Sequence, residues 1–366
     1  MKICVVTPRY MISGVALAQH RFARSLAAAG HQVDLVIGRV DPGLTVPPSP
    51  GVNVITLDLP KVRNMIVPLW RYLRRERPEV VFSAEDHLNT MVLLTAIFVR
   101  SNARISGSSR VRPFDTFSDA PAYRRWLLKQ LVRLTFWRAD VLTCVSQEMV
   151  GQYRAIFKNA PHVCVYNIVA DASSLERMGA AVDEPWLIEK DVPVVIAAGN
   201  LAPWKGFADL IEAIGKLERK GRKLRLIILG DGPLRGELEA QVVRLGLGHA
   251  IKLPGFVDNP LRYFARADVF VLSSYVEGLP NVLVEAMMCG CTPVSTDCPT
   301  GPREVLNDGQ FGYLVPVGDA AALAAGIEAA LDHPIAPELL AEAVRPFEER
   351  AVINRHFALL GLAEAD

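Results

Sequence analysis

Short β-rich runs alternate with helical stretches in both halves of the chain, and this alternation constrains the fold more than any other feature. Strands joined by helices pair in parallel, so two successive series predict an α/β protein with two doubly wound parallel sheets. Such sheets bind ligands at the carboxyl ends of their strands. The predicted strands are Lys2–Thr7, Gln32–Ile37, Val192–Ala198, Leu224–Leu229 and Val269–Ser273, and the predicted helices are Val15–Ala29, which ends at Gly30, and Gly206–Lys220.

Two domains follow from this pattern and from the length of the chain. With 366 residues, 51% of them apolar, the chain can form two domains that each have a core. Periodicity is lost between residues 168 and 191, which predicts a linker there. We therefore expect one domain over residues 1–168 and a second over residues 190–346.

The net charge of +1 hides an asymmetry between the two halves. Residues 1–190 carry a net charge of +8 and residues 191–366 a net charge of −7. A basic first half suits an anionic membrane surface or an acceptor that bears a diphosphate. The acidic second half argues against a nucleic-acid surface running across the whole protein.

Localisation and thiol chemistry are also constrained. The start of the chain lacks the charged and apolar regions of a signal segment, and Leu88–Val99, the longest uncharged apolar run, is too short to cross a bilayer. We expect a cytoplasmic protein, with peripheral contact to the inner face of the membrane as a further possibility. The six cysteines show no CxxC spacing, which favours buried reduced thiols over zinc ligands or disulfides.

The segment Glu277–Glu285 carries most of the chemistry. It places two carboxylates eight residues apart across a glycine turn that leads into an apolar helix. Asn281 is predicted as the N-cap, so the free amides and positive dipole end of the helix would face the turn and stabilise a phosphate. Glu285 would lie one turn further on, in reach of a nucleotide's hydroxyls. A plain surface loop before a capped helix is the alternative.

Further motifs follow in order along the chain. They are Gly199-Asn200-Leu201, Lys205-Gly206, Leu229-Gly-Asp-Gly-Pro233, Pro254-Gly-Phe256, Thr292-Pro-Val-Ser-Thr-Asp297, Cys298–Glu304 and Gly309–Val315, with Ser13-Gly14 ahead of a helix that ends in Gly30-His31.

Together these motifs resemble glycosyltransferase family 4, the retaining group 1 enzymes that use nucleotide sugars and have the GT-B fold. The resemblance spans nearly the whole chain. It implies two Rossmann-like domains facing a cleft. The first domain would take the acceptor and the second the nucleotide sugar. It also implies that a last helix, within residues 347–366, crosses back to pack on the first domain.

The resemblance implies roles on the donor side. Glu285 would hold the ribose hydroxyls, Glu277 would face the transferred sugar, and Lys205 would be the cation for the diphosphate. A single ammonium aimed at the leaving diphosphate stabilises charge that grows in the transition state. A solvated lysine before a helix is the other interpretation of Lys205. The backbone of Gly278, Leu279, Pro280, Asn281 and Val282 is expected to contact the sugar and phosphates, through the amides of the residues other than proline.

Three donor-side positions carry open questions. Many family members have arginine where this chain has Asn200, so half of the expected cationic clamp is missing. Gly14 stands alone where the family often has two glycines, and it either lets the backbone approach the diphosphate or is merely a turn glycine. Phe256 either stacks on the base or fills the core. Uracil is the base expected from family frequency, with guanine second.

Acceptor-side residues are predicted from the end of an early strand. Asp86 and His87 follow that strand, where family members often carry a histidine near the reacting centre. A buried, hydrogen-bonded histidine is the alternative for His87. Arg110 and Arg112 would bind an acceptor phosphate or form a surface pair.

Two basic, aromatic stretches suggest a membrane contact. They are Val67–Arg77 and Ala122–Arg138, in which tryptophan and leucine are interspersed with arginine and lysine. This composition suits an anionic interface. Both stretches could equally be ordinary helices of the first domain.

The function implied by the resemblance is that of a retaining, metal-independent glycosyltransferase with no cofactor. It would move a hexose or N-acetylhexosamine from a nucleoside diphosphate, UDP foremost, to a glycan or lipid-linked glycan acceptor in bacterial surface polysaccharide synthesis. The leaving diphosphate oxygen itself would take the acceptor's proton on the same face, and a covalent intermediate remains the formal alternative. Rival functions are a GT-B sugar-nucleotide epimerase and a non-catalytic nucleotide-sugar-binding partner of a synthase complex.

Overall fold

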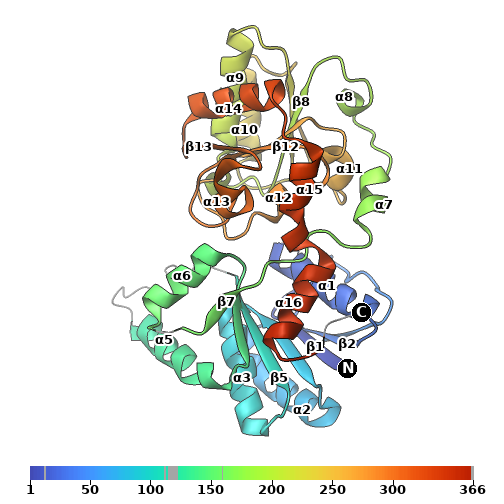
Figure 1. Cartoon of the computed structure of the whole chain (residues 1–366), viewed down its shortest axis with the longest axis vertical. Coiled ribbons are helices and arrows are strands. Elements are labelled where there is room, and N and C mark those ends of the chain that lie inside the picture. Colours follow the sequence, from blue (N-terminus) through green and yellow to red (C-terminus); the bar gives the residue numbers. More distant parts are fainter. Residues whose placement is uncertain (12–13, 111–112, 114–122, 159, 364–366) are drawn as a thin grey trace. The chain divides into compact units, whose positions relative to one another are not determined.

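The computed structural model describes residues 1–11, 14–110, 113, 123–158 and 160–363. The chain forms two compact units, residues 1–171 together with 348–366, and residues 172–347. Each unit is built around one sheet of parallel strands (Figure 1).

The first unit contains a seven-stranded sheet in the order β3-β2-β1-β4-β5-β6-β7. Residues 3–6 of β1 are all buried, because helices cover both faces of the sheet. The strands are β1 (Lys2–Thr7), β2 (Gln32–Ile37), β3 (Val52–Thr56), β4 (Val80–Ala84), β5 (Arg104–Ser109), β6 (Val141–Cys144) and β7 (His162–Cys164).

Side chains of β1 alternate between two cores. Ile3 and Val5 pack in one core with residues of α1 and α16, whereas Cys4 and Val6 pack in another with residues of α2 and α3. The helices of this unit are α1 (Gly14–Ala28), η1 (Val62–Met65), α2 (Ile66–Glu76), α3 (Asp86–Val99), α5 (Tyr123–Thr135), η2 (Phe136–Arg138), α6 (Gln147–Ile156) and α16 (Glu349–Leu359).

Helix α16 belongs to the first unit although it follows the second unit in sequence. Its start is tied to the first segment, since the amide of Glu349 donates to the carbonyl of Ala170 over 3.0 Å. Val352, Ile353 and Phe357 are buried in the core that contains α1, and α16 lies beside α1 in Figure 1.

The second unit contains a six-stranded sheet in the order β10-β9-β8-β11-β12-β13. Helices α9 and α14 pack on one face of it around Val195, Val269 and Val294. The strands are β8 (Val194–Ala198), β9 (Arg225–Leu229), β10 (Ile251–Gly255), β11 (Val269–Leu272), β12 (Thr292–Thr296) and β13 (Tyr313–Val315).

The helices of the second unit begin within the segment predicted as a linker, where α7 packs on α11. They are α7 (Ser174–Gly179), α8 (Pro185–Ile188), η3 (Pro203–Lys205), α9 (Phe207–Arg219), α10 (Arg235–Arg244), α11 (Leu261–Phe264), α12 (Asn281–Met288), α13 (Pro302–Val305), η4 (Asn307–Gly309), α14 (Ala320–Asp332), α15 (Pro337–Val344) and η5 (Arg345–Phe347).

The cysteines lie where apolar runs place them. Cys4, Cys144, Cys291 and Cys298 are buried free thiols, and Cys164 and Cys289 are half-buried free thiols. Burial raises the pKa of Cys4 and of Cys298 to about 12, so both are neutral thiols at physiological pH. Among the helices of the described ranges, none has the length and apolar character needed to cross a bilayer.

Candidate nucleotide-sugar and acceptor sites

The turn that carries Lys205 is held against the end of β11. Lys205 ends η3, and Gly206 follows with a φ of 63°. A Cβ atom on Gly206 would lie 2.0 Å from the carbonyl oxygen of Ser273, so only glycine allows this approach. Two hydrogen bonds close the contact, from the Ser273 hydroxyl to the carbonyl of Lys205 over 2.8 Å and from the Tyr275 amide to the carbonyl of Trp204 over 2.8 Å.

This contact brings Lys205 and Glu277 together. The Lys205 Nζ lies 2.6 Å from Oε1 of Glu277, and Oγ of Ser274 donates to the same oxygen over 2.6 Å. The two charged side chains are only 18% and 11% exposed, so solvent screens the pair weakly. The structure thus places a paired cation and carboxylate at the carboxyl ends of β8 and β11, where a doubly wound sheet binds its ligand.

The glycine turn after Glu277 is supported by the loop of residues 299–301. The Thr300 hydroxyl donates to the carbonyl of Glu277. Gly301 has a φ of 96°, and a Cβ atom there would lie 2.6 Å from Cδ of Pro280. Thr300 also has a positive φ, of 66°, an uncommon conformation for a non-glycine residue that needs support from its surroundings. The sequence motif containing this loop pointed to the family but not to this supporting role.

The start of α12 differs from the prediction. The helix begins at Asn281 itself, with Pro280 at the N-cap position and no side-chain cap, so the expected N-cap role of Asn281 is wrong. Pro280 is compatible with this position because its fixed φ suits the entry to a helix. The first amides of α12 lack intrahelical partners whichever residue caps the helix. Glu285 lies one turn beyond Asn281, and because the two are four residues apart they share a helix face.

Two further donor-side positions are exposed. The Asn200 side chain lies over the Gly230-Asp-Gly-Pro233 turn. A Cβ atom on Gly232 would lie 2.3 Å from Oδ1 of Asn200. Phe256 follows β10 with 57% of its surface exposed, so the interpretation that it fills the core is wrong. An exposed aromatic ring at the end of a strand can stack on a planar base.

In the first unit, Asp86 is half-buried where β4 leads into α3. It accepts hydrogen bonds from Oγ of Ser109 over 2.5 Å and from the Tyr153 hydroxyl. Burial raises the pKa of Asp86, and the two hydrogen bonds oppose that rise. Asp86 therefore ties β5 and α6 to the start of α3.

His87 is the next residue of this turn and is exposed. Its Nε2 atom is 3.2 Å from Oε2 of Glu85, and its side chain is 51% exposed. The alternative of a buried histidine is therefore wrong. The hydrogen bond that His87 donates to the Glu85 carboxylate raises the pKa of His87. Glu85 itself has a φ of 80°, and such strain in a residue next to titratable groups is common at functional sites.

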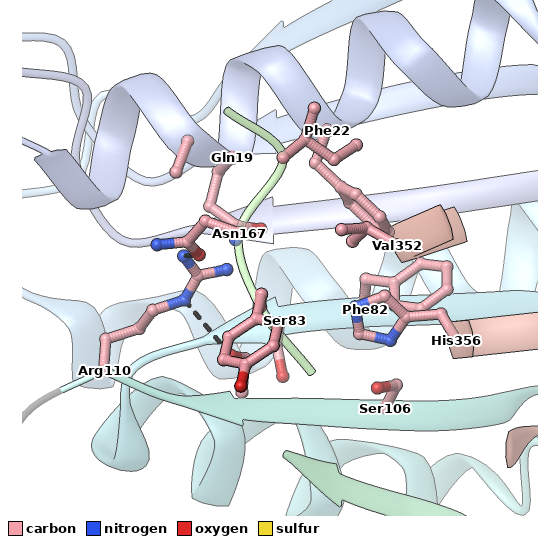
Figure 2. A pocket seen from close by; sticks show the side chains of 13 residues that line it. Gln19, Phe22, Phe82, Ser83, Ser106, Arg110, Asn167, Val352 and His356 are labelled. Atoms are coloured by element: carbon pink, nitrogen blue, oxygen red, sulfur yellow. Dashed lines mark hydrogen bonds between the residues drawn. The ribbon is translucent and has the colours of Figure 1, made fainter. Parts of the chain in front are cut away.

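Arg110 follows β5 and lines a pocket of the first unit (Figure 2). Its Nε atom donates to Oγ of Ser108 over 3.1 Å, and Nη1 donates to Oδ1 of Asn167. These partners show that Arg110 is not part of the simple surface pair considered as an alternative. Arg112 lies outside the described residues, as does Ser13, and Gly14 is the first residue of α1.

Two family profiles match this chain in succession. The profile described as "Glycosyl transferase 4-like domain" matches residues 13–167, and the one described as "Glycosyl transferases group 1" matches residues 181–346. The chain belongs to the group 1 glycosyltransferases of family 4.

Curated relatives of this family 4 chain include three with informative names. The Campylobacter jejuni N-acetylgalactosamine-N,N'-diacetylbacillosaminyl-diphospho-undecaprenol 4-alpha-N-acetylgalactosaminyltransferase is 33% identical over 56% of this chain and 54% of its own length. The Rhizobium meliloti lipopolysaccharide core biosynthesis glycosyltransferase LpsE is 34% identical over 46% of this chain and 50% of its own length. The Erwinia amylovora amylovoran biosynthesis glycosyltransferase AmsD is 25% identical over 81% of both chains. For the first two, the match spans about half the length of the relative.

Solved structures of the same architecture confirm the expected fold class. Anabaena HepE in complex with UDP and glucose has a TM-score of 0.74 at 17% identity, with 98% of both chains covered. The lipopolysaccharide outer core galactosyltransferase WaaB in its apo form has a TM-score of 0.74 at 16% identity, with 99% of both chains covered. Together with the two parallel sheets, these similarities show that the family 4 chain has the GT-B fold.

The structure brings two of the predicted donor-side residues together, Lys205 and Glu277, whereas the roles of Lys205, Glu277 and Glu285 stay predictions. Ser274 and Thr300, which bond to Glu277, were not predicted from the sequence. The residues around Arg110 in the first unit were not predicted either. A signal was present there, because Ser106, Ser108 and Arg110 alternate along β5 and so lie on one face of the sheet.

Proposed function

We propose that this protein is a retaining glycosyltransferase that moves a hexose or N-acetylhexosamine from a nucleoside diphosphate, UDP foremost, to a glycan or lipid-linked glycan acceptor. The observation that carries the proposal is the Lys205–Glu277 pair, with Ser274 on the same carboxylate, directly before the glycine turn that opens α12. The pair combines a cation for a leaving diphosphate with a carboxylate for a sugar hydroxyl.

In the proposed site, the chain's own groups bind and stabilise charge. The α12 amides and Lys205 would face the diphosphate, and the ammonium would stabilise the charge that develops as the sugar leaves. Glu277 would orient the sugar, with its own position fixed by Ser274 and Lys205. Glu285 would accept hydrogen bonds from the ribose hydroxyls.

Retention of configuration would follow from a proton transfer on the leaving-group side. The departing diphosphate oxygen can take the proton of the acceptor hydroxyl on the same face of the sugar, which removes the need for a separate protein base. His87 would lie on the acceptor side, and its pairing with Glu85 supports a role in orienting a hydroxyl. We assign no nucleophile to Glu277.

The nature of the substrates is supported by the names of related proteins. HepE has been solved with UDP, and the Campylobacter relative acts on a diphospho-undecaprenol-linked sugar. The Rhizobium relative belongs to lipopolysaccharide core biosynthesis. We therefore propose a uridine donor, a lipid-linked acceptor and a role in bacterial surface polysaccharide synthesis, with the chain in the cytoplasm.

A peripheral contact with an anionic membrane surface fits the first unit. Helix α5 buries Val132 on one side, whereas Trp126, Leu134 and the following Trp137 are 57%, 69% and 72% exposed. Asp and Glu are absent from residues 120–139, while arginine and lysine occur five times. Exposed aromatic side chains among cations are the composition of an interfacial helix, so α5 acts both as a domain helix and as a membrane-facing one.

The experiment that tests the donor site is a thermal shift against nucleoside diphosphates and their sugars. A ligand of the native state raises the melting temperature by mass action. We expect a selective rise with one base, lost in Lys205→Ala and in Glu285→Ala. Lys223→Ala and Glu237→Ala, which remove exposed charges of the same unit, should retain the rise. The absence of a shift with every nucleotide would contradict the donor site.

A non-catalytic nucleotide-sugar-binding role is the second possibility, and Asn200 favours it because an exposed amide supplies no charge where relatives have arginine. Donor hydrolysis or transfer that is abolished in Glu285→Ala would establish an enzyme. Retained donor binding without turnover on lipid-linked and soluble acceptors would establish the binding role instead.

A further inference from the structure

The pocket beside Arg110 lies within the first unit, at the carboxyl ends of its parallel strands. Its walls come from α1, β4, β5, the segment after β7, and α16. Figure 2 shows Arg110 and His356 on opposite sides of the pocket, with Gln19 of α1 on a third side. None of the roles proposed above for donor groups uses this space.

The charge of Arg110 is not balanced inside the pocket. In the described part of the chain, its guanidinium bonds only to the neutral side chains of Ser108 and Asn167 and forms no ion pair with a carboxylate. Burial of this cation lowers the pKa of Arg110 to about 10, which leaves it charged at neutral pH. The carboxylate of Glu85 opposes this shift from outside the pocket lining, so the charge is compensated only in part and an incoming anion would compensate it further.

Three polar groups of the same pocket lack partners. Gln19 Oε1, Ser106 Oγ and His356 Nδ1 are buried and accept or donate no hydrogen bond within the described residues. Each side chain is at most 9% exposed. Leaving a buried polar atom unpaired is unfavourable, so three in one pocket indicate that a bound molecule, either water or a polar ligand, pairs with them.

The chemistry of these groups selects an anion with several oxygen atoms. An arginine fork matches the oxygens of a phosphate in geometry and charge. The Ser106 hydroxyl can donate to such a group, and the Gln19 amide can turn its NH₂ toward it. Burial and the positive charge of Arg110 lower the pKa of His356 to about 3, so its ring is neutral and can present an N–H.

We propose that this pocket binds a phosphate group of the acceptor through Arg110, Ser106, Gln19 and His356. The assignment of this phosphate to the acceptor rests on the proposed transfer function. The anion site itself rests on the pocket alone. Position supports the acceptor, because the pocket belongs to the first unit whereas Lys205 and Glu277 belong to the second.

The test is calorimetric titration of the full chain with farnesyl diphosphate, inorganic phosphate and UDP. We expect farnesyl diphosphate to bind the wild type more tightly than inorganic phosphate, and Arg110→Gln to weaken both at least tenfold while leaving UDP binding unchanged. Arg104→Gln is the matched control, because it removes the same charge at the other end of β5. It should bind all three probes as the wild type does.

Ser106→Ala separates ligand binding from folding. The Ser106 hydroxyl has no partner, so its removal should leave the melting temperature unchanged or raise it, yet weaken farnesyl diphosphate binding several-fold. Unchanged binding in both Arg110→Gln and Ser106→Ala would overturn the site. Equal affinity for inorganic phosphate and farnesyl diphosphate, or loss of UDP binding in Arg110→Gln, would overturn its assignment to the acceptor.

The outcomes also separate this inference from the proposed function. Arg110-dependent binding of farnesyl diphosphate in a protein that binds no nucleotide sugar would support the anion site while contradicting the transferase. Lys205-dependent UDP binding without any Arg110-dependent anion binding would support the nucleotide site of the transferase while contradicting the anion site.

Discussion

Lys205 and Glu277 lie 72 residues apart in the sequence, yet their charged atoms are 2.6 Å apart, with Ser274 bonded to the same carboxylate oxygen. The pair is more than four-fifths shielded from solvent on both sides. Each group therefore depends on the other, both for its position and for the compensation of its charge. A diphosphate would enter a site where the cation is already fixed.

Substitution of this pair should affect activity more than stability. We expect Glu277→Gln, which keeps the shape of the side chain, to lower the transfer rate about 10²–10³-fold, the size of effect found when one charge-stabilising group is lost. Lys205→Met and Glu277→Gln should each lower the melting temperature, and the double variant should lower it by less than the two changes added together. Steady-state kinetics and calorimetric melting measure both effects, and additive melting shifts would show that the pair is not coupled.

Gly206→Ala should be strongly destabilising. The new methyl group would meet the Ser273 carbonyl at 2.0 Å, and the φ of 63° is unfavourable for alanine. We expect a loss of about 3 kcal/mol or more in the free energy of unfolding, within the range of severe backbone effects. Gly236→Ala in α10 is the control, since nothing lies within 4 Å of its Cβ position and alanine favours a helix. Equal urea midpoints for the two variants would refute the steric explanation.

Asn200→Arg should tighten nucleotide binding. Asn200 is exposed, so a longer side chain has room, and arginine would supply the second cation that the family resemblance leads us to expect. We expect the Kd for UDP to fall about tenfold, which corresponds to roughly 1.4 kcal/mol. Asn200→Gln lengthens the side chain without adding charge and should leave the Kd unchanged. A fall of the same size in Asn200→Gln would assign the effect to contact rather than charge.

Acid should destabilise the first unit through His162. Burial lowers the pKa of His162 to about 3 from its usual 6.5. Between pH 3 and pH 6.5, His162 is therefore protonated in the unfolded chain but neutral in the folded chain. Its contribution to stability is complete above pH 6.5 and is lost as the pH falls toward 3. By pH 5 the loss should be about 2 kcal/mol.

Urea unfolding at pH 7.5 and pH 5 of the wild type and of His162→Leu measures this effect. The variant should show a smaller loss on acidification, because its leucine takes up no proton. His249→Leu, an exposed histidine of the second unit, should retain the wild-type loss. Asp86 acts in the opposite direction, since its raised pKa favours the folded state in acid, but it is common to all three proteins.

Trp126→Ser combined with Trp137→Ser should abolish membrane binding. Both rings are more than half exposed in a stretch that carries only positive charges. In flotation with vesicles of phosphatidylglycerol and phosphatidylethanolamine, the wild type should be found in the vesicle fraction at low salt. The share of protein in that fraction should fall as added salt screens the cations. Trp204→Ser, an exposed tryptophan of the second unit, should float like the wild type. A wild type that stays in the soluble fraction even at low salt would remove the membrane contact.

Local patterns predicted the five strands and two helices named from the sequence to within two residues, because continuous apolar runs and helical periodicity are properties of neighbouring residues. The predicted strand Gln32–Ile37 has the bounds observed for β2, and the predicted helix Val15–Ala29 differs from α1 by one residue at each end. The prediction of Asn281 as the N-cap was wrong because α12 begins at Asn281 itself, with Pro280 at the N-cap position.

The supporting residues of the site could not be read from spacing. Thr300 reaches Glu277 through a turn with two successive positive φ angles, which no residue preference predicts for a threonine. Arg110 donates to Asn167, which lies 57 residues later in the sequence. His356, on the far wall of the same pocket, follows Asn167 by nearly two hundred residues. Contacts of this kind depend on the tertiary fold, so only the alternation of Ser106, Ser108 and Arg110 hinted at them.

The return of α16 to the first unit has a consequence for biosynthesis. Because Phe357 and its neighbours complete the core around α1, the part of the chain made first cannot complete that core until residue 357 has been made, whereas residues 172–347 can fold earlier. The second unit would thus reach its native state before the first. The nascent N-terminal sheet would be exposed to chaperones for most of synthesis, and a stop codon ahead of α16 would yield a protein with one folded half.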